Sequence, residues 1–96
     1  MLILKTLTVQ PMHGYGIAKH IQRLSQEVLR VEEGSLYPAL QRMRQKGWIR
    51  AEWRQTPNNQ RARYYTITAA GRKQLGVVES GFDELVAAIG RVMRTA

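Results

Sequence analysis

Hydrophobic residues recur at helical spacing in four segments of the chain and alternate with polar residues in two others. The first segment predicts a short helix over residues 2–9, apolar nearly all round and ended by Pro11 and the glycines that follow. The second predicts an amphipathic helix that begins at Tyr15 or Gly16 and ends near Ser25. Residues 26–33 are too short for another helix, so we expect a linker or a brief strand there.

The third helical segment, GSLYPALQRMRQKG, contains a proline within its apolar stripe. A proline inside a helix removes a backbone hydrogen bond, whereas the first turn has free N–H groups in any case. We therefore place the N-cap at Gly34 or Ser35, which puts Pro38 in the first turn. The helix is then expected to run to about Lys46 and to end at Gly47.

Strict alternation predicts two strands after this helix, one over residues 49–54 and one starting at Arg63. Between them lies QTPNNQRA, a polar stretch that predicts a loop of about eight residues and hence a hairpin with a long basic tip. On the second strand, Tyr65 and Ile67 are expected to share one side. Both tryptophans, Trp48 and Trp53, are expected in the core at the base of the hairpin.

The last segment predicts a helix capped by Thr68, with apolar residues spaced 3, 4, 3, 4, 3 as in a heptad seam. A helix of about 25 residues is nearly 40 Å long and outruns so small a core, so we favour a second copy of the chain as its partner. Packing onto its own domain is the alternative. The elements together predict a mainly α fold with a small β hairpin: a winged helix-turn-helix domain over residues 1–68 and a dimerisation helix over residues 69–96.

Charge adds a candidate partner to this picture. The net charge is +8, and residues 42–73 contain nine basic side chains against the single acid Glu52. A basic middle indicates a polyanion such as nucleic acid, with a surface merely kept soluble by its charge as the alternative.

Several classes of function are disfavoured by the residues present. The chain has no cysteine, which excludes disulfides, thiolate metal sites and a cysteine nucleophile. His13 and His20 have no acidic neighbours at ligand spacing, so neither a metal nor another cofactor is expected. No set of residues suggests an enzyme active site. No apolar run is long enough to span a bilayer, and a cytoplasmic protein is expected.

Three motifs in order along the chain are PMHGYGIAKHI, VEEGSLYPALQRMRQKGWI and RARYYTITAAGRKQL. Together they resemble the PadR family of winged-helix transcriptional regulators, in particular its compact subgroup with one C-terminal helix. The resemblance extends to about Leu75. It implies a homodimeric, repressor-type protein whose third helix enters the major groove of DNA and whose wing lies along the adjacent backbone.

Two departures from the family pattern affect the expected dimer and the expected effector site. The family's first helix usually has several residues before the part that matches LILKTL, so the alternatives here are a truncated chain or reduced N-terminal dimer contacts. Larger relatives also have a C-terminal helical domain that helps to form an effector pocket. A small-molecule effector of this chain would instead lie between the two subunits, near Trp48, Trp53 or Phe82.

The outer face of the third helix has the chemistry that reading DNA requires. Glutamine can pair with adenine and arginine with guanine, and a helix N-terminus suits a phosphate. Tyr37 could alternatively be a half-buried packing residue. The expected DNA contacts are Tyr15, Ser35, Tyr37, Pro38, Gln41, Arg42, Gln45, Asn59, Arg61 and Arg63. The expected dimer contacts are Leu4, Leu75, Val78, Phe82, Leu85, Ile89 and Val92.

Two functions follow from this fold. The leading one is a sequence-specific transcriptional regulator, a repressor that binds a pseudo-palindromic operator as a homodimer. The alternative is a winged-helix module that docks another protein without reading DNA. A docking module would favour an apolar or acidic outer face on the third helix, whereas the face here is polar and basic.

Overall fold

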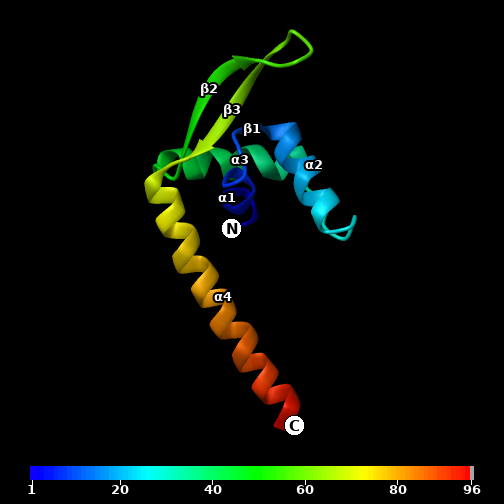
Figure 1. Cartoon of the computed structure of the whole chain (residues 1–96), viewed down its shortest axis with the longest axis vertical. Helices are drawn as coiled ribbons and strands as arrows, with labels where there is room; N and C mark the ends of the chain where they lie inside the picture. Colours follow the sequence, from blue (N-terminus) through cyan, green and yellow to red (C-terminus); the bar gives the residue numbers. More distant parts are fainter. Residues whose placement is uncertain (96) are drawn as a thin grey trace.

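The computed structural model describes residues 1–95, which fold into four helices and a small sheet (Figure 1). A three-helix unit lies at the centre, a β hairpin projects from it at one end, and the last helix runs away from it at the other. The principal extents are 57 × 29 × 22 Å. The predicted winged helix-turn-helix architecture is confirmed. The elements are α1 (Leu2–Leu7), β1 (Met12–His13), α2 (Gly14–Leu24), α3 (Glu33–Gln45), β2 (Ile49–Gln55), β3 (Arg61–Ile67) and α4 (Ala69–Thr95).

One hydrophobic core holds the three short helices against the base of the hairpin. Each helix contributes two residues at i, i+3 or i, i+4 spacing, which lie on one face of a helix. The residues from β2 and β3 are those that point to the helix side of the sheet. The core consists of Leu4, Leu7, Met12, Ile17, Ile21, Leu36, Leu40, Ile49, Tyr65, Ile67 and Leu75.

The sheet has a third strand that the sequence pattern did not predict. Met12 and His13 form β1, which pairs antiparallel with β3 opposite Tyr65 and Tyr64, giving the order β1-β3-β2. A strand of two residues is too short to have a recognisable alternation. Of the two alternatives for the segment after α2, the structure has the linker and not the brief strand, up to the start of α3 at Glu33. In this linker Gln26 and Glu27 take positive φ values of 53° and 68°.

The hairpin, which we call the wing, consists of β2, β3 and the five residues that connect them. The strands pair from Ile49 opposite Ile67 to Gln55 opposite Arg61, so the loop is shorter than the predicted eight residues. Backbone bonds across residues 56–60 close it, with Thr56 N–H donating to the Gln60 carbonyl at 2.6 Å. Asn59 adopts a φ of 65° there, a conformation that asparagine tolerates better than most residues.

Helix α3 begins earlier than predicted. Its N-cap is Glu32, without a side-chain hydrogen bond, and Pro38 lies in the second turn and not in the first. Because proline has no N–H, the carbonyl of Gly34 loses its usual partner four residues later. Gly34 is exposed, so water can hydrogen-bond to that carbonyl at little cost. The prediction that Gly34 or Ser35 caps the helix was therefore wrong.

Helix α4 is anchored to the turn between α3 and β2. Thr68 caps it as predicted, with its hydroxyl accepting from the Gly71 N–H at 3.1 Å. The same hydroxyl donates to the Gly47 carbonyl at 2.6 Å, and the Thr68 N–H donates to the Trp48 carbonyl at 3.0 Å. Gly71 and Leu75 are buried, so the first two turns of α4 pack with the core. The division at residue 68 remains a prediction, and Ala96 lies outside the described residues.

Candidate nucleic-acid interface

The outer face of α3 is exposed along its whole length. Leu36 and Leu40 face the core and are almost completely buried. The residues predicted to contact DNA lie on the opposite side, as helical periodicity requires. The Arg44 guanidinium donates to the side-chain oxygen of Gln41 at 3.0 Å, which holds that amide in place. The exposed residues are Tyr37, Pro38, Gln41, Arg42 and Gln45.

Few of the basic side chains are neutralised within the chain. Among residues 1–95, ion pairs join only Lys5 to Glu79, at 3.4 Å, and Arg54 to Glu52. The arginines of α3 and the two arginines of β3 therefore have no carboxylate partner in this part of the chain. Unpaired positive charge of this kind favours binding of a polyanion.

The start of α2 is fixed by His13, which the sequence analysis considered only as a metal ligand and set aside. The His13 side chain caps the helix, with its Nδ1 accepting from the Gly16 N–H at 3.0 Å. Its ring packs against the rings of Tyr15 and Tyr64, with centroid distances of 6.3 and 5.3 Å. Histidine is not among the preferred N-cap residues, so composition gave no signal for this role. The cap presents Tyr15, 57% exposed, at the N-terminal end of α2.

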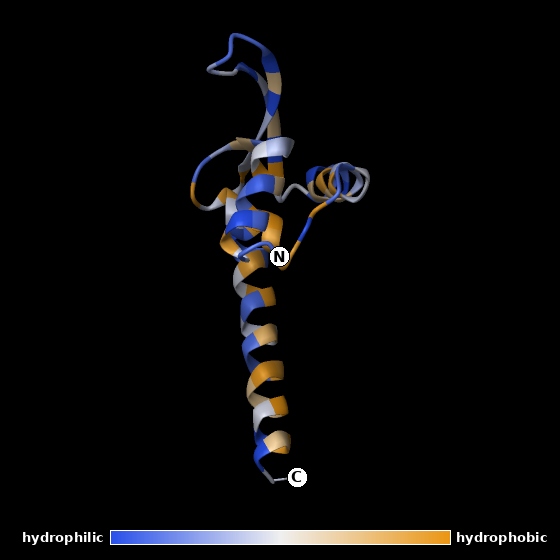
Figure 2. Cartoon of the chain, turned by 90° about the vertical axis from the view of Figure 1, so that its right-hand side faces the viewer, coloured by the Kyte–Doolittle hydropathy of each residue, from blue (hydrophilic) through white to orange (hydrophobic). Residues whose placement is uncertain are grey.

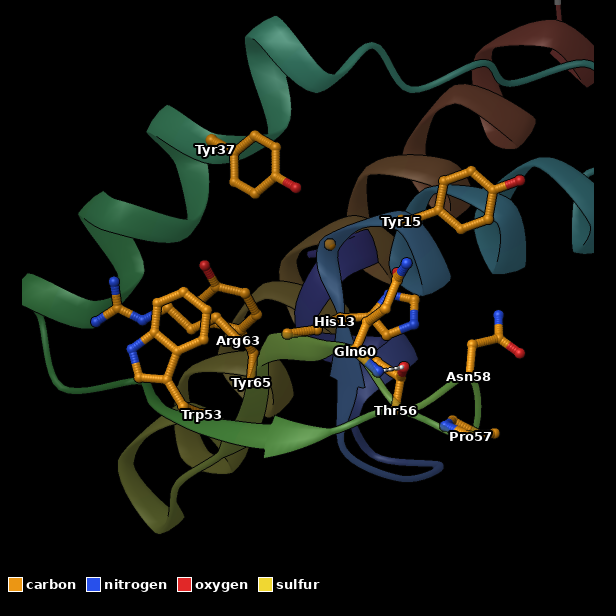
Figure 3. A pocket seen from close by; sticks show the side chains of 12 residues that line it. His13, Tyr15, Tyr37, Trp53, Thr56, Pro57, Asn58, Gln60, Arg63 and Tyr65 are labelled. Carbon is orange, nitrogen blue, oxygen red and sulfur yellow. Dashed lines mark hydrogen bonds between the residues drawn. The ribbon is translucent and has the colours of Figure 1, made fainter.

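A groove of about 880 Å³ separates the starts of α2 and α3 from the wing (Figure 3). Tyr37 projects into it from α3, and Tyr15 lies across from Tyr37 at the start of α2. No acidic side chain among residues 1–95 lines this groove. Its lining consists of His13, Gly14, Tyr15, Tyr37, Trp53, Thr56, Pro57, Asn58, Gln60, Ala62, Arg63 and Tyr65.

Tyr37 has both a packing role and an exposed surface. A Cβ atom at Gly14 would lie 2.9 Å from the Tyr37 hydroxyl, so the absence of a side chain at Gly14 makes room for the ring. Partial burial, followed by the charge of the nearby Glu33 carboxylate, raises the pKa of Tyr37 above its ordinary value. The phenol is therefore a neutral hydrogen-bond donor at physiological pH.

The other predicted DNA contacts differ in how close they lie to this groove. Arg63 lines it, whereas Arg61 and Asn59 are exposed on the wing beside it. Ser35 is exposed on the first turn of α3 but does not line the groove. The Ser35 N–H already donates to the Glu32 carbonyl at 3.1 Å, so only its hydroxyl is available to a phosphate.

Trp53 was predicted in the core, and this prediction was wrong. It is 59% exposed and lines the groove, because β2 extends past the helices that could cover it. Trp48, in contrast, packs against the core at the base of the wing, as expected.

Comparison with known proteins agrees with this architecture. The model of the transcriptional regulator PadR-like family matches residues 3–77. The chain belongs to the PadR-like family. It is thus a winged-helix, DNA-binding transcriptional regulator by family, and its similarity is to regulators and not to enzymes.

Solved structures of similar fold cover nearly the whole PadR-like chain. A transcriptional regulator from Clostridium thermocellum is 27% identical with a TM-score of 0.85, over 94% of this chain and 87% of that one. A PadR family transcription regulator from Clostridium difficile R20291 is 26% identical with a TM-score of 0.82, over 96% of this chain and 94% of that one. An uncharacterized protein X from Lysinibacillus sphaericus is 25% identical over 84 residues, 88% of this chain and 77% of that protein.

The PadR-like chain has a second exposed surface along α4, where hydrophobic residues form a stripe down one side (Figure 2). Phe82 and Ile89 each expose 52% of their surface. Two of the predicted dimer contacts, Leu4 and Leu75, are only 1% and 6% exposed because the chain's own core covers them. The surface that a partner could cover therefore begins after Leu75. It comprises Val78, Phe82, Leu85, Ile89 and Val92, with Val86 and Met93 beside them.

The aromatic residues considered for an effector do not meet in one cavity of this regulator. Trp53 lines the groove beside the wing, whereas Phe82 lines a hollow between α1 and α4 with Met1 and Leu2. No helix within residues 1–95 is both long and apolar enough to cross a membrane.

Proposed function

We propose that this PadR-like regulator binds a specific double-stranded operator as a homodimer and represses the gene that the operator controls. The observation that carries the proposal is the outer face of α3, which is exposed, basic and free of acidic side chains from Gln41 to Lys46. It stands beside a wing that contributes further unpaired arginines. Repression is the simplest consequence when such a protein occupies promoter DNA.

The two parts of this surface have different tasks in the proposal. Gln41, Arg42 and Gln45 contact base edges in the major groove, where glutamine and arginine can distinguish base pairs. Tyr15, Ser35 and Tyr37 donate hydrogen bonds to the phosphates that flank the major groove of the DNA. Asn59, Arg61 and Arg63 hold the neighbouring backbone, and they add affinity without selecting a sequence.

The homodimer in this proposal is formed through the α4 stripe. A helix of 27 residues with exposed apolar residues at heptad spacing is marginally stable alone and gains stability when a second copy covers the stripe. Two copies related by a two-fold axis present two α3 helices, which suits half-sites about one helical turn, roughly 34 Å, apart. The operator would then be pseudo-palindromic.

The dimer is tested by placing a charge on the stripe. Ile89→Asp puts a carboxylate at a seam position, whereas Ala87→Asp adds the same charge at an exposed position on the other side of the helix. We expect analytical ultracentrifugation to give a monomer for Ile89→Asp and a dimer for Ala87→Asp. Equal masses for both variants would contradict dimerisation through this stripe.

DNA recognition is tested by fluorescence anisotropy. The protein is titrated into a labelled duplex from upstream of its own gene and into a scrambled duplex of the same composition, at two salt concentrations. We expect tighter binding to the upstream duplex that persists at the higher salt concentration, because base contacts depend less on counterion release than phosphate contacts. Equal affinities for the two duplexes that both disappear at the higher salt concentration would show only non-specific attraction between a basic protein and DNA. Absence of binding even at low salt would favour a protein-docking module.

A further inference from the structure

The wing has two faces of different chemistry. In an antiparallel pair, residues directly opposite each other share a face, and Trp53 lies opposite Arg63. Arg61 is its diagonal neighbour on the same face, with its guanidinium 5.6 Å from the Trp53 ring centroid. The other face carries Glu52 and Arg54, which pair with each other, so the single acid of the wing points away from Trp53. The Trp53 face is therefore cationic and aromatic, without an acid to repel a polyanion.

The Trp53 face is also the one that looks onto the groove. Figure 3 shows the indole of Trp53 and the ring of Tyr37 on opposite sides of the hollow, one from the wing and the other from α3. Arg63 lies beside Trp53 on the wing side. Its Nε atom is buried and has no hydrogen-bond partner within the described residues, while the whole side chain is only partly buried. The groove thus offers hydrogen-bond donors on both sides, and on the wing side the broad apolar surface of Trp53 lies next to the donor Arg63.

An apolar ring flanked by cationic donors matches the backbone of a nucleic-acid strand. Along that backbone, anionic phosphates alternate with deoxyribose rings, whose C–H groups are apolar. Tyrosine hydroxyls and arginines suit the phosphates, and an indole is a flat surface that packs well against a sugar while its positive edge and neighbouring cation remain near the phosphates. A protein ligand with acidic side chains could also satisfy these donors. It would not by itself account for the exposed indole that lies beside them.

We propose that Trp53 packs against a deoxyribose of the DNA strand that crosses from the recognition helix α3 to the wing. The inference rests on the DNA-binding function proposed above and adds a contact that charge alone does not supply. Trp53 makes the wing contribution partly independent of salt. It also fixes how far the wing lies from the backbone, because the ring bears on the sugar while Arg61 reaches the flanking phosphate.

Affinity measurements separate this contact from electrostatics. Trp53→Ala should weaken binding to the upstream duplex about tenfold, the equivalent of roughly 1.4 kcal/mol, with no change in the slope of log K against log salt. Arg61→Ala should instead make the slope of log K against log salt less steep by about one unit, as expected for the loss of one phosphate contact. Trp53→Phe, which keeps a smaller ring, should lose about half as much in log K as Trp53→Ala. Since Trp53 is largely exposed, these variants should fold, and thermal unfolding of each is recorded alongside.

Fluorescence tests the contact directly, because the chain has two tryptophans. In Trp48→Phe the emission comes from Trp53, and saturating DNA should reduce its quenching by acrylamide about twofold as the sugar covers one side of the ring. In the matched variant Trp53→Phe the emission comes from Trp48, which packs against the core, and DNA should leave its quenching unchanged.

A double-mutant cycle decides whether Trp53 acts only by holding Arg61 in place. If it touches the sugar, Trp53→Ala weakens binding by about the same factor in the wild-type and in the Arg61→Ala background. Loss of its effect in the Arg61→Ala background would overturn the sugar contact, as would equal affinities for wild type and Trp53→Ala with unaltered quenching. In those cases DNA binding by the wild type stands. If the wild type itself binds no DNA, both the proposed function and this inference are overturned.

Discussion

Gly71 is the position where a single methyl group should most disturb the attachment of α4 to the domain. A Cβ atom there would overlap the Trp48 carbonyl oxygen and lie 3.0 Å from the carbonyl carbon and 2.9 Å from Cγ1 of Ile67. Two of these three neighbours are backbone atoms at the end of the α3–β2 turn, which cannot rotate away as a side chain would. Gly71→Ala therefore requires the first turn of α4 to move.

The size of the effect can be worked from the contacts. Moving the Cβ atom from 3.0 Å to an ordinary separation of 3.4 Å from the carbonyl carbon requires a shift of at least 0.4 Å, and the carbonyl oxygen requires a larger one. Overpacking of this kind costs about 1–3 kcal/mol, and weakening the bond from Thr68 N–H to the Trp48 carbonyl costs about 1 kcal/mol more. The higher helix propensity of alanine returns up to about 1 kcal/mol. The net expectation is destabilisation by about 2 kcal/mol.

Thermal and urea unfolding at one fixed protomer concentration measure this change, because an oligomer's stability depends on concentration. For a chain of this length, about 2 kcal/mol corresponds to a fall in Tm of roughly 8–16 °C. Gly76→Ala is the matched control in the same helix, since among residues 1–95 no atom other than its chain neighbours and the helix's own nearby backbone lies within 4 Å of its Cβ position. The control should raise stability by about 0.5–1 kcal/mol. A Gly71→Ala variant that is as stable as the control would refute the close approach of α4 to Trp48.

Two further predictions concern the start of α2 and the groove. His13→Ala removes the N-cap of α2 and should lower the free energy of unfolding by about 1 kcal/mol, whereas His20→Ala, which removes no cap, should change it less; urea titration distinguishes them. For Tyr37, the folded-state pKa lies above the unfolded value of 10.0, so its contribution to stability is complete below pH 10 and is lost as pH rises through the folded value. Tyr37→Phe should therefore flatten the alkaline fall of the unfolding free energy, and a fall as steep as in the wild type would contradict the raised pKa.

Periodicity predicted those parts of the fold in which local pattern and tertiary burial agree. Helix α2 shows this most clearly, because Ile17 and Ile21 lie one turn apart and both are buried. The side preference of β3 was likewise correct, with Tyr65 and Ile67 on the buried side. The Thr68 cap was predictable because threonine is a common N-cap residue and a helical pattern follows it.

The missed features depend on contacts between distant parts of the chain. Strand β1 exists because β3 offers it a partner, and two residues have no period of their own. Alternation placed Trp53 on the same side as Ile49, but it could not reveal that the wing extends beyond the core. The start of α3 at Glu33 depends on backbone bonds to Glu32, with no side-chain cap for composition to indicate.

The candidate site also has one part that the sequence predicted and one part that it did not. The outer face of α3 followed from the helical period once Leu36 and Leu40 were taken as core. The groove could not be predicted from the helical period, because it is formed by the starts of two helices and the wing, three segments that are separated in sequence. The fit of Tyr37 against Gly14 is a contact of this kind and has no signal in the local pattern.

The central claim is that the outer face of α3 selects the DNA sequence while the wing holds the backbone of any sequence. The most direct test compares Gln41→Ala with Arg61→Ala on the upstream and scrambled duplexes at one salt concentration. The account predicts that Gln41→Ala loses about 1–3 kcal/mol of discrimination with scrambled-duplex binding unchanged, and that Arg61→Ala weakens binding to both duplexes alike. If Gln41→Ala kept full discrimination, or if both variants weakened both duplexes equally, the assignment of α3 as the sequence-reading element would be contradicted.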